Sequence, residues 1–235
     1  SAVVEAAGSK RVTAARICAI DVQSHKVTSP GEVLDCDLIV SSGGYSPVVH
    51  LASHLGGKPT WREDILAFVP GDGLQKRFCA GAVNGVFGLG DALADGVEAG
   101  VSAAAEAGYK AVSASLPQVV VHLEEPTQAL FQVPHDKPTA RAPKQFVDLQ
   151  NDVTAAGIEL ATREGFESVE HVKRYTALGF GTDQGKLGNI NGLAIAARSL
   201  GISIAQMGTT MFRPNYTPVT FGAVAGRHCG ELFEA

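Results

Sequence analysis

The sequence predicts an α/β part over residues 1–116 and a small helical part over residues 148–235. Strand-like and helix-like segments alternate in the first part, as they do in α/β proteins. Three short amphipathic helices follow one another in the second part. Residues 117–147 contain five prolines and no helical periodicity, so they predict an extended linker with one short strand at 119–123.

Composition and charge exclude several classes of protein. The chain has 235 residues, of which 45% are apolar and 18% charged, which is enough for a globular protein with real cores. No apolar run is long enough to cross a membrane, and no secretion signal is visible. A net charge of -5 without clustered Lys and Arg argues against nucleic-acid binding. Four widely spaced cysteines fit free thiols, so we expect a cytoplasmic protein.

The first part begins with strands. Residues 12–22 alternate between apolar and polar types, and residues 33–40 end in a continuous apolar run. That run predicts a buried parallel strand. A sharp turn at Gly43 and Gly44 follows, since glycine adopts conformations that other residues resist. A short helix is expected over residues 48–55.

A second strand and helix carry candidate ligand-binding residues. The apolar stretch 84–91 predicts a strand that delivers Asp91 to the carboxyl end of the sheet, where ligands of α/β proteins collect. The small-residue stretch 96–114 predicts a helix whose first amides are free to bind phosphate. Asp91 as a simple cap of that helix is the alternative. The candidate residues of this unit are Gly90, Asp91, Gly96 and Val97.

The helical part shows a capping residue before each helix and a glycine after it. The first helix is expected over 154–165 and the second over 168–179. The third should run from Asn189 or Asn191 to Gly201. His171, Lys173 and Arg174 predict an exposed or interface face on the second helix.

A polar segment over residues 209–218 follows these helices and is dense in hydroxyls and aromatics. Its Arg213 is able to bind a phosphate or carboxylate through two parallel hydrogen bonds, or to make a structural ion pair. No nucleophile, base and acid come together anywhere in the sequence, and no His or Cys pairs have metal-ligand spacing. We therefore expect no catalytic residue and no metal ligand in this chain.

Two long stretches resemble the alpha subunit of heterotetrameric sarcosine oxidase. They are VTAAGIELATREGFESVEHVKRYTALGFGTDQGK and FRPNYTPVTFGAVAGR. The resemblance extends upstream through CDLIVSSGGYSPVVHLASHLGGKP and NGVFGLGDALADGVEAG, so it covers nearly the whole chain. It covers only a middle part of the family's long subunit. No GxGxxG fingerprint occurs in the chain, so we expect a fragment that holds part of a dinucleotide-binding fold.

The resemblance implies the activity of an assembled enzyme. Such an enzyme oxidatively demethylates sarcosine to glycine and passes electrons through flavins to oxygen, which yields hydrogen peroxide. The methyl carbon leaves as formaldehyde or as methylenetetrahydrofolate. The alpha subunit is associated with NAD, whereas FAD and covalently held FMN belong mainly with the beta subunit, with FMN at the interface. Gamma and delta subunits are further partners, and the fragment alone is expected to be inactive.

The resemblance also implies roles for particular residues. The turn at Gly43 and Gly44 would lie near the cofactor, and Asp91 would bind a ribose or ribitol hydroxyl beside Gly90 and the amides of Gly96 and Val97. Lys186 would contact a phosphate or another subunit, whereas a solvated loop charge is the alternative. A nicotinamide dinucleotide is the implied cofactor.

The helical part departs from a wider family in an informative way. It resembles the small [2Fe-2S] domain of related amino-acid and opine dehydrogenases, whose four cysteine positions fall here on Asp148, Gln150, Asp183 and Gly188. Thiolates are absent at all four, so this chain is not expected to hold a cluster. Two alternatives remain, a non-catalytic scaffold and a subunit of a related amino-acid or opine dehydrogenase.

Overall fold

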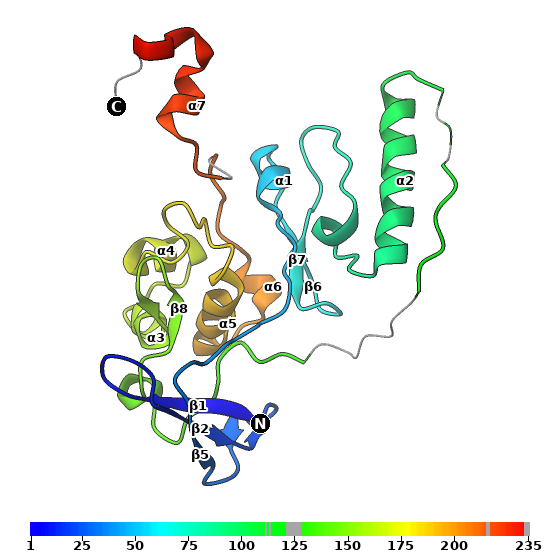
Figure 1. The fold of residues 1–235 in the computed structure, drawn as a ribbon. Coiled ribbons are helices and arrows are strands. Elements are labelled where there is room, and N and C mark those ends of the chain that lie inside the picture. Colours follow the sequence, from blue (N-terminus) through cyan, green and yellow to red (C-terminus); the bar gives the residue numbers. More distant parts are fainter. Residues whose placement is uncertain (111, 113, 121–127, 215–216, 233–235) are drawn as a thin grey trace.

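The computed structural model describes residues 1–110, 112, 114–120, 128–214 and 217–232 and has a mixed α/β architecture (Figure 1). An antiparallel sheet in the order β1-β2-β5 opens the chain, and a small β3-β4 hairpin lies between β2 and β5 in sequence. The bounds are β1 Ala2–Ala7, β2 Ala14–Cys18, β3 Ile20–Asp21, β4 Lys26–Val27 and β5 Glu32–Asp35.

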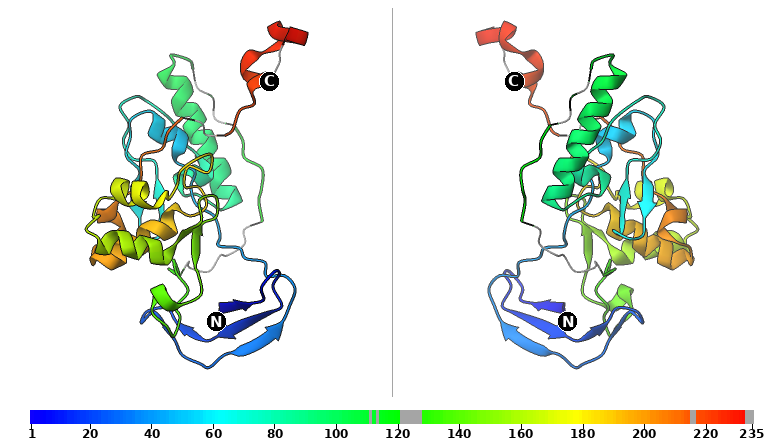
Figure 2. Two further views of the ribbon diagram at one scale, coloured as in Figure 1. Left: turned by 90° about the vertical axis from the view of Figure 1, so that its left-hand side faces the viewer. Right: turned by 90° about the vertical axis from the view of Figure 1, so that its right-hand side faces the viewer.

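The next region holds a hairpin and a long helix that stands apart. The hairpin of β6 and β7 lies beside the helices α5 and α6, whereas α2 stands away from them in Figure 1; Figure 2 shows the same elements from two sides. A short 3-10 helix, η1, leads into α2. The bounds are α1 His50–His54, β6 Thr60–Arg62, β7 Ala67–Val69, η1 Gly81–Asn84 and α2 Leu89–Glu106.

The helical part follows the linker. The linker holds the 3-10 helix η2, and the strand expected over 119–123 falls partly outside the described residues. A two-stranded ribbon of β8 and β9 precedes the helices, and α7 projects away from the body (Figure 1). The bounds are η2 Thr139–Arg141, β8 Phe146–Asp148, β9 Val153–Thr154, α3 Ala155–Arg163, α4 Val169–Thr176, α5 Asn189–Leu200, α6 Ile204–Met207, α7 Phe221–Ala225 and η3 Arg227–Leu232.

Local signals placed the helices of this part correctly. The Thr154 hydroxyl accepts a hydrogen bond of 3.1 Å from the Gly157 amide at the start of α3, as an N-cap does. Ser168 is the N-cap of α4, and Gly201 ends α5 in a left-handed conformation with φ of 68°. The three predicted helices are therefore confirmed.

The prediction of a buried parallel strand over 33–40 is wrong. Strand β5 ends at Asp35, pairs antiparallel with β2 and is the edge strand of its sheet. All four of its residues are exposed, and Val40 beyond it is 83% exposed. A strand becomes buried on both faces only where layers cover both sides of its sheet, which an apolar run alone does not guarantee.

The prediction of a strand over 84–91 is also wrong. A left-handed Gly85, with φ of 77°, ends η1, and Gly88 is the N-cap from which α2 begins at Leu89. The helix then continues for 18 residues, rich in alanine although it includes three glycines. The Gly-Asp pair therefore lies in the first turn of a helix and not at the end of a strand.

The main core joins the helical part to the β6-β7 hairpin. Its largest fully buried side chains come from α3, α4, α5 and the loop after α4, and they are Ile158, Val172, Leu178, Leu193 and Ile195. Phe68 of β7 belongs to the same cluster and is 5% exposed. Trp61 of β6 packs edge-on against Phe68, with 5.1 Å between ring centroids. The core thus includes residues from both sides of the linker.

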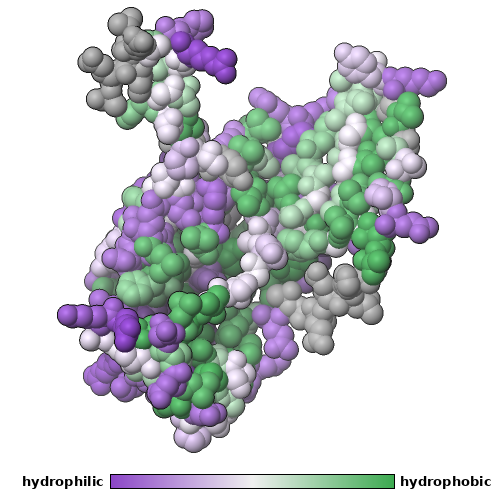
Figure 3. All heavy atoms as spheres, in the orientation of Figure 1, coloured by the Kyte–Doolittle hydropathy of each residue, from purple (hydrophilic) through white to green (hydrophobic). Residues whose placement is uncertain are grey.

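Apolar side chains also remain at the surface. Figure 3 shows them over α2 and around the N-terminal sheet. Leu89 of α2 is 65% exposed and Val33 of β5 is 64% exposed. Across the described residues, no helix combines the length and the apolar character needed to cross a lipid bilayer.

Candidate functional site

A cavity of about 240 Å³ lies between α4, the loop 179–186 and Arg213, and we call it the cationic pocket. Its charged lining residues are Glu170, Lys173, Arg174 and Arg213. Three of these side chains are cations and one is an anion. The Glu170 carboxylate accepts a hydrogen bond of 2.6 Å from the Met211 amide and lies 3.4 Å from Arg174. Positive charge therefore prevails in the pocket.

Lys173 is a buried member of the cationic pocket. Lys173 is 8% exposed, and its ammonium group donates a hydrogen bond of 3.2 Å to the Met211 carbonyl. Burial lowers the pKa of Lys173, and the nearby Arg213 and Arg174 lower it further against the opposing effect of Glu170. An anion bound here would stabilise the charged form of this side chain.

The backbone of Arg213 is fixed from two sides. Its amide donates a hydrogen bond of 3.0 Å to the side-chain oxygen of Gln184, and its carbonyl lies 2.6 Å from Nε2 of His54 in α1. The preceding Phe212 is 7% exposed and lies against the ring of His50, with 3.9 Å between centroids. Arg213 is exposed, and among the ion pairs of the described residues none involves it.

His50 joins α1 to the loop 179–186. Its Nε2 atom lies 2.8 Å from the Gln184 carbonyl, so that nitrogen carries the proton. Burial lowers the pKa of His50, whereas the hydrogen bond to the carbonyl acts in the opposite direction. The α/β part and the helical part therefore meet beside the cationic pocket.

A second cavity, of about 390 Å³, brings together three predicted residues. Gly43 and Gly44 line one side of it and Lys186 another. The Lys186 ammonium group donates a hydrogen bond of 3.2 Å to the Asp183 carbonyl. Apolar residues such as Phe131 and Ile190 and polar residues such as Gln128 and Asn191 complete the wall. The volume falls within the range of small-molecule sites, about 300–1,000 Å³.

The other four predicted residues lie on α2. Gly90 and Asp91 are in its first turn, where backbone amides have no partner within the helix. Gly96 and Val97 lie in the middle of α2, where amides bond to carbonyls one turn earlier. The expectation that Gly96 and Val97 offer free amides is therefore wrong, because the helix begins seven residues before Gly96.

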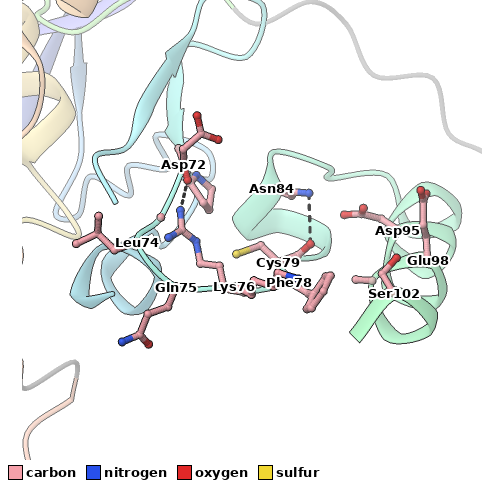
Figure 4. A pocket seen from close by; sticks show the side chains of 15 residues that line it. Asp72, Leu74, Gln75, Lys76, Phe78, Cys79, Asn84, Asp95, Glu98 and Ser102 are labelled. Atoms are coloured by element: carbon pink, nitrogen blue, oxygen red, sulfur yellow. Dashed lines mark hydrogen bonds between the residues drawn. The ribbon is translucent and has the colours of Figure 1, made fainter. Parts of the chain in front are cut away.

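Another cavity lies beside α2 and was not predicted. It measures about 520 Å³ and lies between residues 70–79 and one face of the helix (Figure 4). That face carries Asp95, Glu98 and Ser102. Their spacing of three and four residues is the sequence signal that places them on one face of a helix. The Asp95 carboxylate accepts a hydrogen bond of 2.7 Å from the Gly81 amide. The lining also includes Lys76 and Arg77, so cations and carboxylates both face this cavity.

The comparisons with known proteins concern most of this chain. Residues 142–227 match the family model described as the sarcosine oxidase A3 domain. The sarcosine oxidase subunit alpha of Rhizobium meliloti (strain 1021) is 40% identical over 209 residues, which cover 86% of this chain. That of Corynebacterium sp. (strain P-1) is 40% identical over 203 residues, 85% of this chain.

The chain is a relative of the sarcosine oxidase alpha subunits. This result confirms the resemblance noted in the sequence and shows an oxidoreductase relationship. The chain spans about a fifth of the length of these curated relatives, 20% and 21% respectively. Their subunit names imply further subunits in a complex.

A solved structure shares the fold of this sarcosine oxidase relative. The L-proline dehydrogenase from P. horikoshii matches 95% of this chain with a TM-score of 0.64 and 18% identity, and the match covers 44% of that protein. The likeness supports the mixed α/β architecture. In the part of the chain that is described, no three His, Cys, Asp or Glu side chains lie together as metal ligands would.

Proposed function

We propose that this chain is a segment of the alpha subunit of a sarcosine oxidase and that its cationic pocket binds the phosphate of FMN at the interface with the beta subunit. The convergence of Lys173, Arg174 and Arg213 on one cavity carries the proposal. Arginine suits phosphate because its planar guanidinium donates parallel hydrogen bonds. The volume of about 240 Å³ accommodates a phosphate group. In the proposal the beta subunit binds the rest of the FMN molecule.

The proposed assembly is a cytoplasmic heterotetramer with beta, gamma and delta subunits that also holds FAD. The flavins would accept the electrons when the CH-NH group of sarcosine is oxidised. Oxygen is the final electron acceptor, and hydrogen peroxide is the product. Formaldehyde, or methylenetetrahydrofolate when tetrahydrofolate is present, takes the methyl carbon. Within this chain the proposed role is to bind and orient the cofactor and to dock the beta subunit. We expect the segment alone to be inactive.

Three regions share this work in the proposal. Residues 1–116 form part of a dinucleotide-binding domain, and residues 117–147 are the linker. Residues 148–235 form a helical domain that resembles a [2Fe-2S] domain without its cysteines. The hydrogen bonds from His50 and His54 to the loop 179–186 and to residue 213 support a fixed contact between the first and third regions.

The test of the FMN proposal is the variant Arg213→Ala. We expect its affinity for FMN, measured by quenching of flavin fluorescence, to fall about 10- to 100-fold, because a hydrogen bond to a charged group contributes about 1.5–3 kcal/mol. Arg163→Ala is the matched control, since Arg163 is an exposed arginine of α3 outside the pocket. A parent chain that binds no FMN would favour the non-catalytic scaffold.

NAD is the second cofactor in the proposal. Gly43, Gly44 and Lys186 line one cavity, which supports a role in binding NAD. For Gly90 and Asp91 the support is limited to their place in the first turn of α2, where backbone amides are free. Gly96 and Val97 do not fit, since their amides are used within the helix. The remaining contacts would come from other parts of the longer subunit.

Asp91→Ala tests that assignment. Asp91 is exposed, so we expect the variant to unfold at the parent's temperature and to bind NAD more weakly by calorimetric titration. Equal NAD affinity in parent and variant would remove Asp91 from the site. A related amino-acid or opine dehydrogenase remains the alternative, and turnover of those substrates by the full complex would favour it.

A further inference from the structure

A buried carboxylate lies in the turn that follows β8. Asp148 is 3% exposed, and one of its oxygens accepts hydrogen bonds from the amides of Gln150 and Asn151, at 2.9 and 3.0 Å. Its other oxygen accepts a hydrogen bond of 2.8 Å from the Gly179 amide, 31 residues later in the sequence. The carboxylate thus fixes its own turn and the first residue of the loop 179–186.

Gln150 fixes the same loop further along. Its side-chain nitrogen donates to the Thr182 hydroxyl at 2.9 Å, and its side-chain oxygen accepts from the Asp183 amide at 2.9 Å. A side chain at Gly181 would approach the Gln150 amide group to 3.1 Å, so the backbone passes close to it. Asp148 and Gln150 therefore hold the loop at three residues.

The opposite side of this loop lines the cationic pocket. Gly179, Gly181 and Gln184 are lining residues. The Gln184 side chain donates to the Gly181 carbonyl at 2.8 Å and accepts from the Arg213 amide at 3.0 Å. A continuous path of contacts thus leads from Asp148 and Gln150 through the loop to Arg213.

We propose that Asp148 and Gln150 are positioning residues for the anion site. They fix the loop 179–186, so that Gln184 holds the backbone of Arg213 where its side chain lines the pocket. This inference rests on the proposed function, because it names the residues that organise the same site. Binding is stronger when the binding groups are already ordered, since the ligand then spends less free energy on ordering them.

The charge of Asp148 allows a sharp test. A carboxylate near the pocket repels an anion, so its removal in Asp148→Asn should strengthen FMN binding if only charge matters. Positioning predicts the opposite sign. In this variant either an amide nitrogen replaces the oxygen that faces the Gly179 amide, or the hydrogen bond loses its charge. Both changes weaken the hold on Gly179. We expect FMN affinity to fall about tenfold, which corresponds to the loss of one hydrogen bond.

Three companion variants define the origin of the effect. Gln150→Ala removes both bonds to the loop and should also weaken FMN binding about tenfold. Gln150→Glu keeps an oxygen for the Asp183 amide and accepts from the Thr182 hydroxyl, so it should keep the amides of residues 179–186 protected from exchange, although its added charge repels an anion. Leu149→Ala is the control in the same turn, because Leu149 is 71% exposed, and it should bind FMN as the parent does.

Amide hydrogen exchange separates ordering of the loop from general instability. We expect faster exchange confined to residues 179–186 in Asp148→Asn and Gln150→Ala, with unchanged protection of α5. Parent-like FMN affinity in both variants, together with a loss in Arg213→Ala, would overturn the positioning role and leave the proposed function intact. A parent chain that does not bind FMN would overturn the proposed function, and this role with it.

Discussion

Truncation of Ile158 to alanine is expected to lower the free energy of unfolding by about 2–5 kcal/mol. Ile158 lies in α3 with no exposed surface, in the cluster formed with Val172, Leu178 and Leu193. Truncation of this side chain would leave a cavity between α3 and α5, because closely packed helices shift too little to close it. Urea denaturation followed by the fluorescence of Trp61 measures the change, because this single tryptophan packs against the same core.

Leu187→Ala is the control for this prediction. Leu187 is 77% exposed, so its truncation should change the free energy of unfolding by less than about 0.5 kcal/mol. An equal loss in the two variants would show that Ile158 is not the centre of the core.

The variant Gly188→Ala is expected to destabilise the protein by about 3 kcal/mol or more. A Cβ atom at position 188 would lie 2.0 Å from the Val147 carbonyl oxygen, and both groups belong to the backbone. Relief requires movement of β8 away from the start of α5. Thermal denaturation followed by circular dichroism measures the loss.

Gly100→Ala provides the control. Gly100 lies within α2, where an added Cβ atom meets nothing within 4 Å, so alanine should stabilise the helix by about 0.5–1 kcal/mol. A Gly188→Ala variant as stable as the parent would contradict the close approach of Val147. The same clash leaves no room for a cysteine at position 188, one of the four positions at which the resembling [2Fe-2S] domains carry ligands.

The sequence predicted the helices α3, α4 and α5 because their signals are local. Capping residues, helical spacing and terminal glycines all lie within the segment that they define. Strand β5 and helix α2 were predicted incorrectly for a different reason. Burial of β5 depends on what covers the sheet, and the start of α2 depends on the left-handed Gly85 and the cap at Gly88.

The candidate site was predicted only in part. Lys186, Gly43 and Gly44 do share a cavity, and Arg213 does line another. Lys173 was expected on an exposed or interface face, and it is buried within this chain, where the Met211 carbonyl, 38 residues later, accepts its hydrogen bond. Partners so distant in sequence leave no periodic signal, and Asp148 and Gln150 were considered only as absent cysteines for the same reason.

Phe68 has a consequence for how this protein divides into modules. The sarcosine oxidase A3 family model begins at residue 142, yet the core beneath those helices is completed by Phe68 and Trp61 of the β6-β7 hairpin. A polypeptide that begins at residue 142 would lack these two aromatic side chains, and the core that they cover would be exposed to water. The unit that is inherited as a recognisable sequence is therefore smaller than the unit that closes a core.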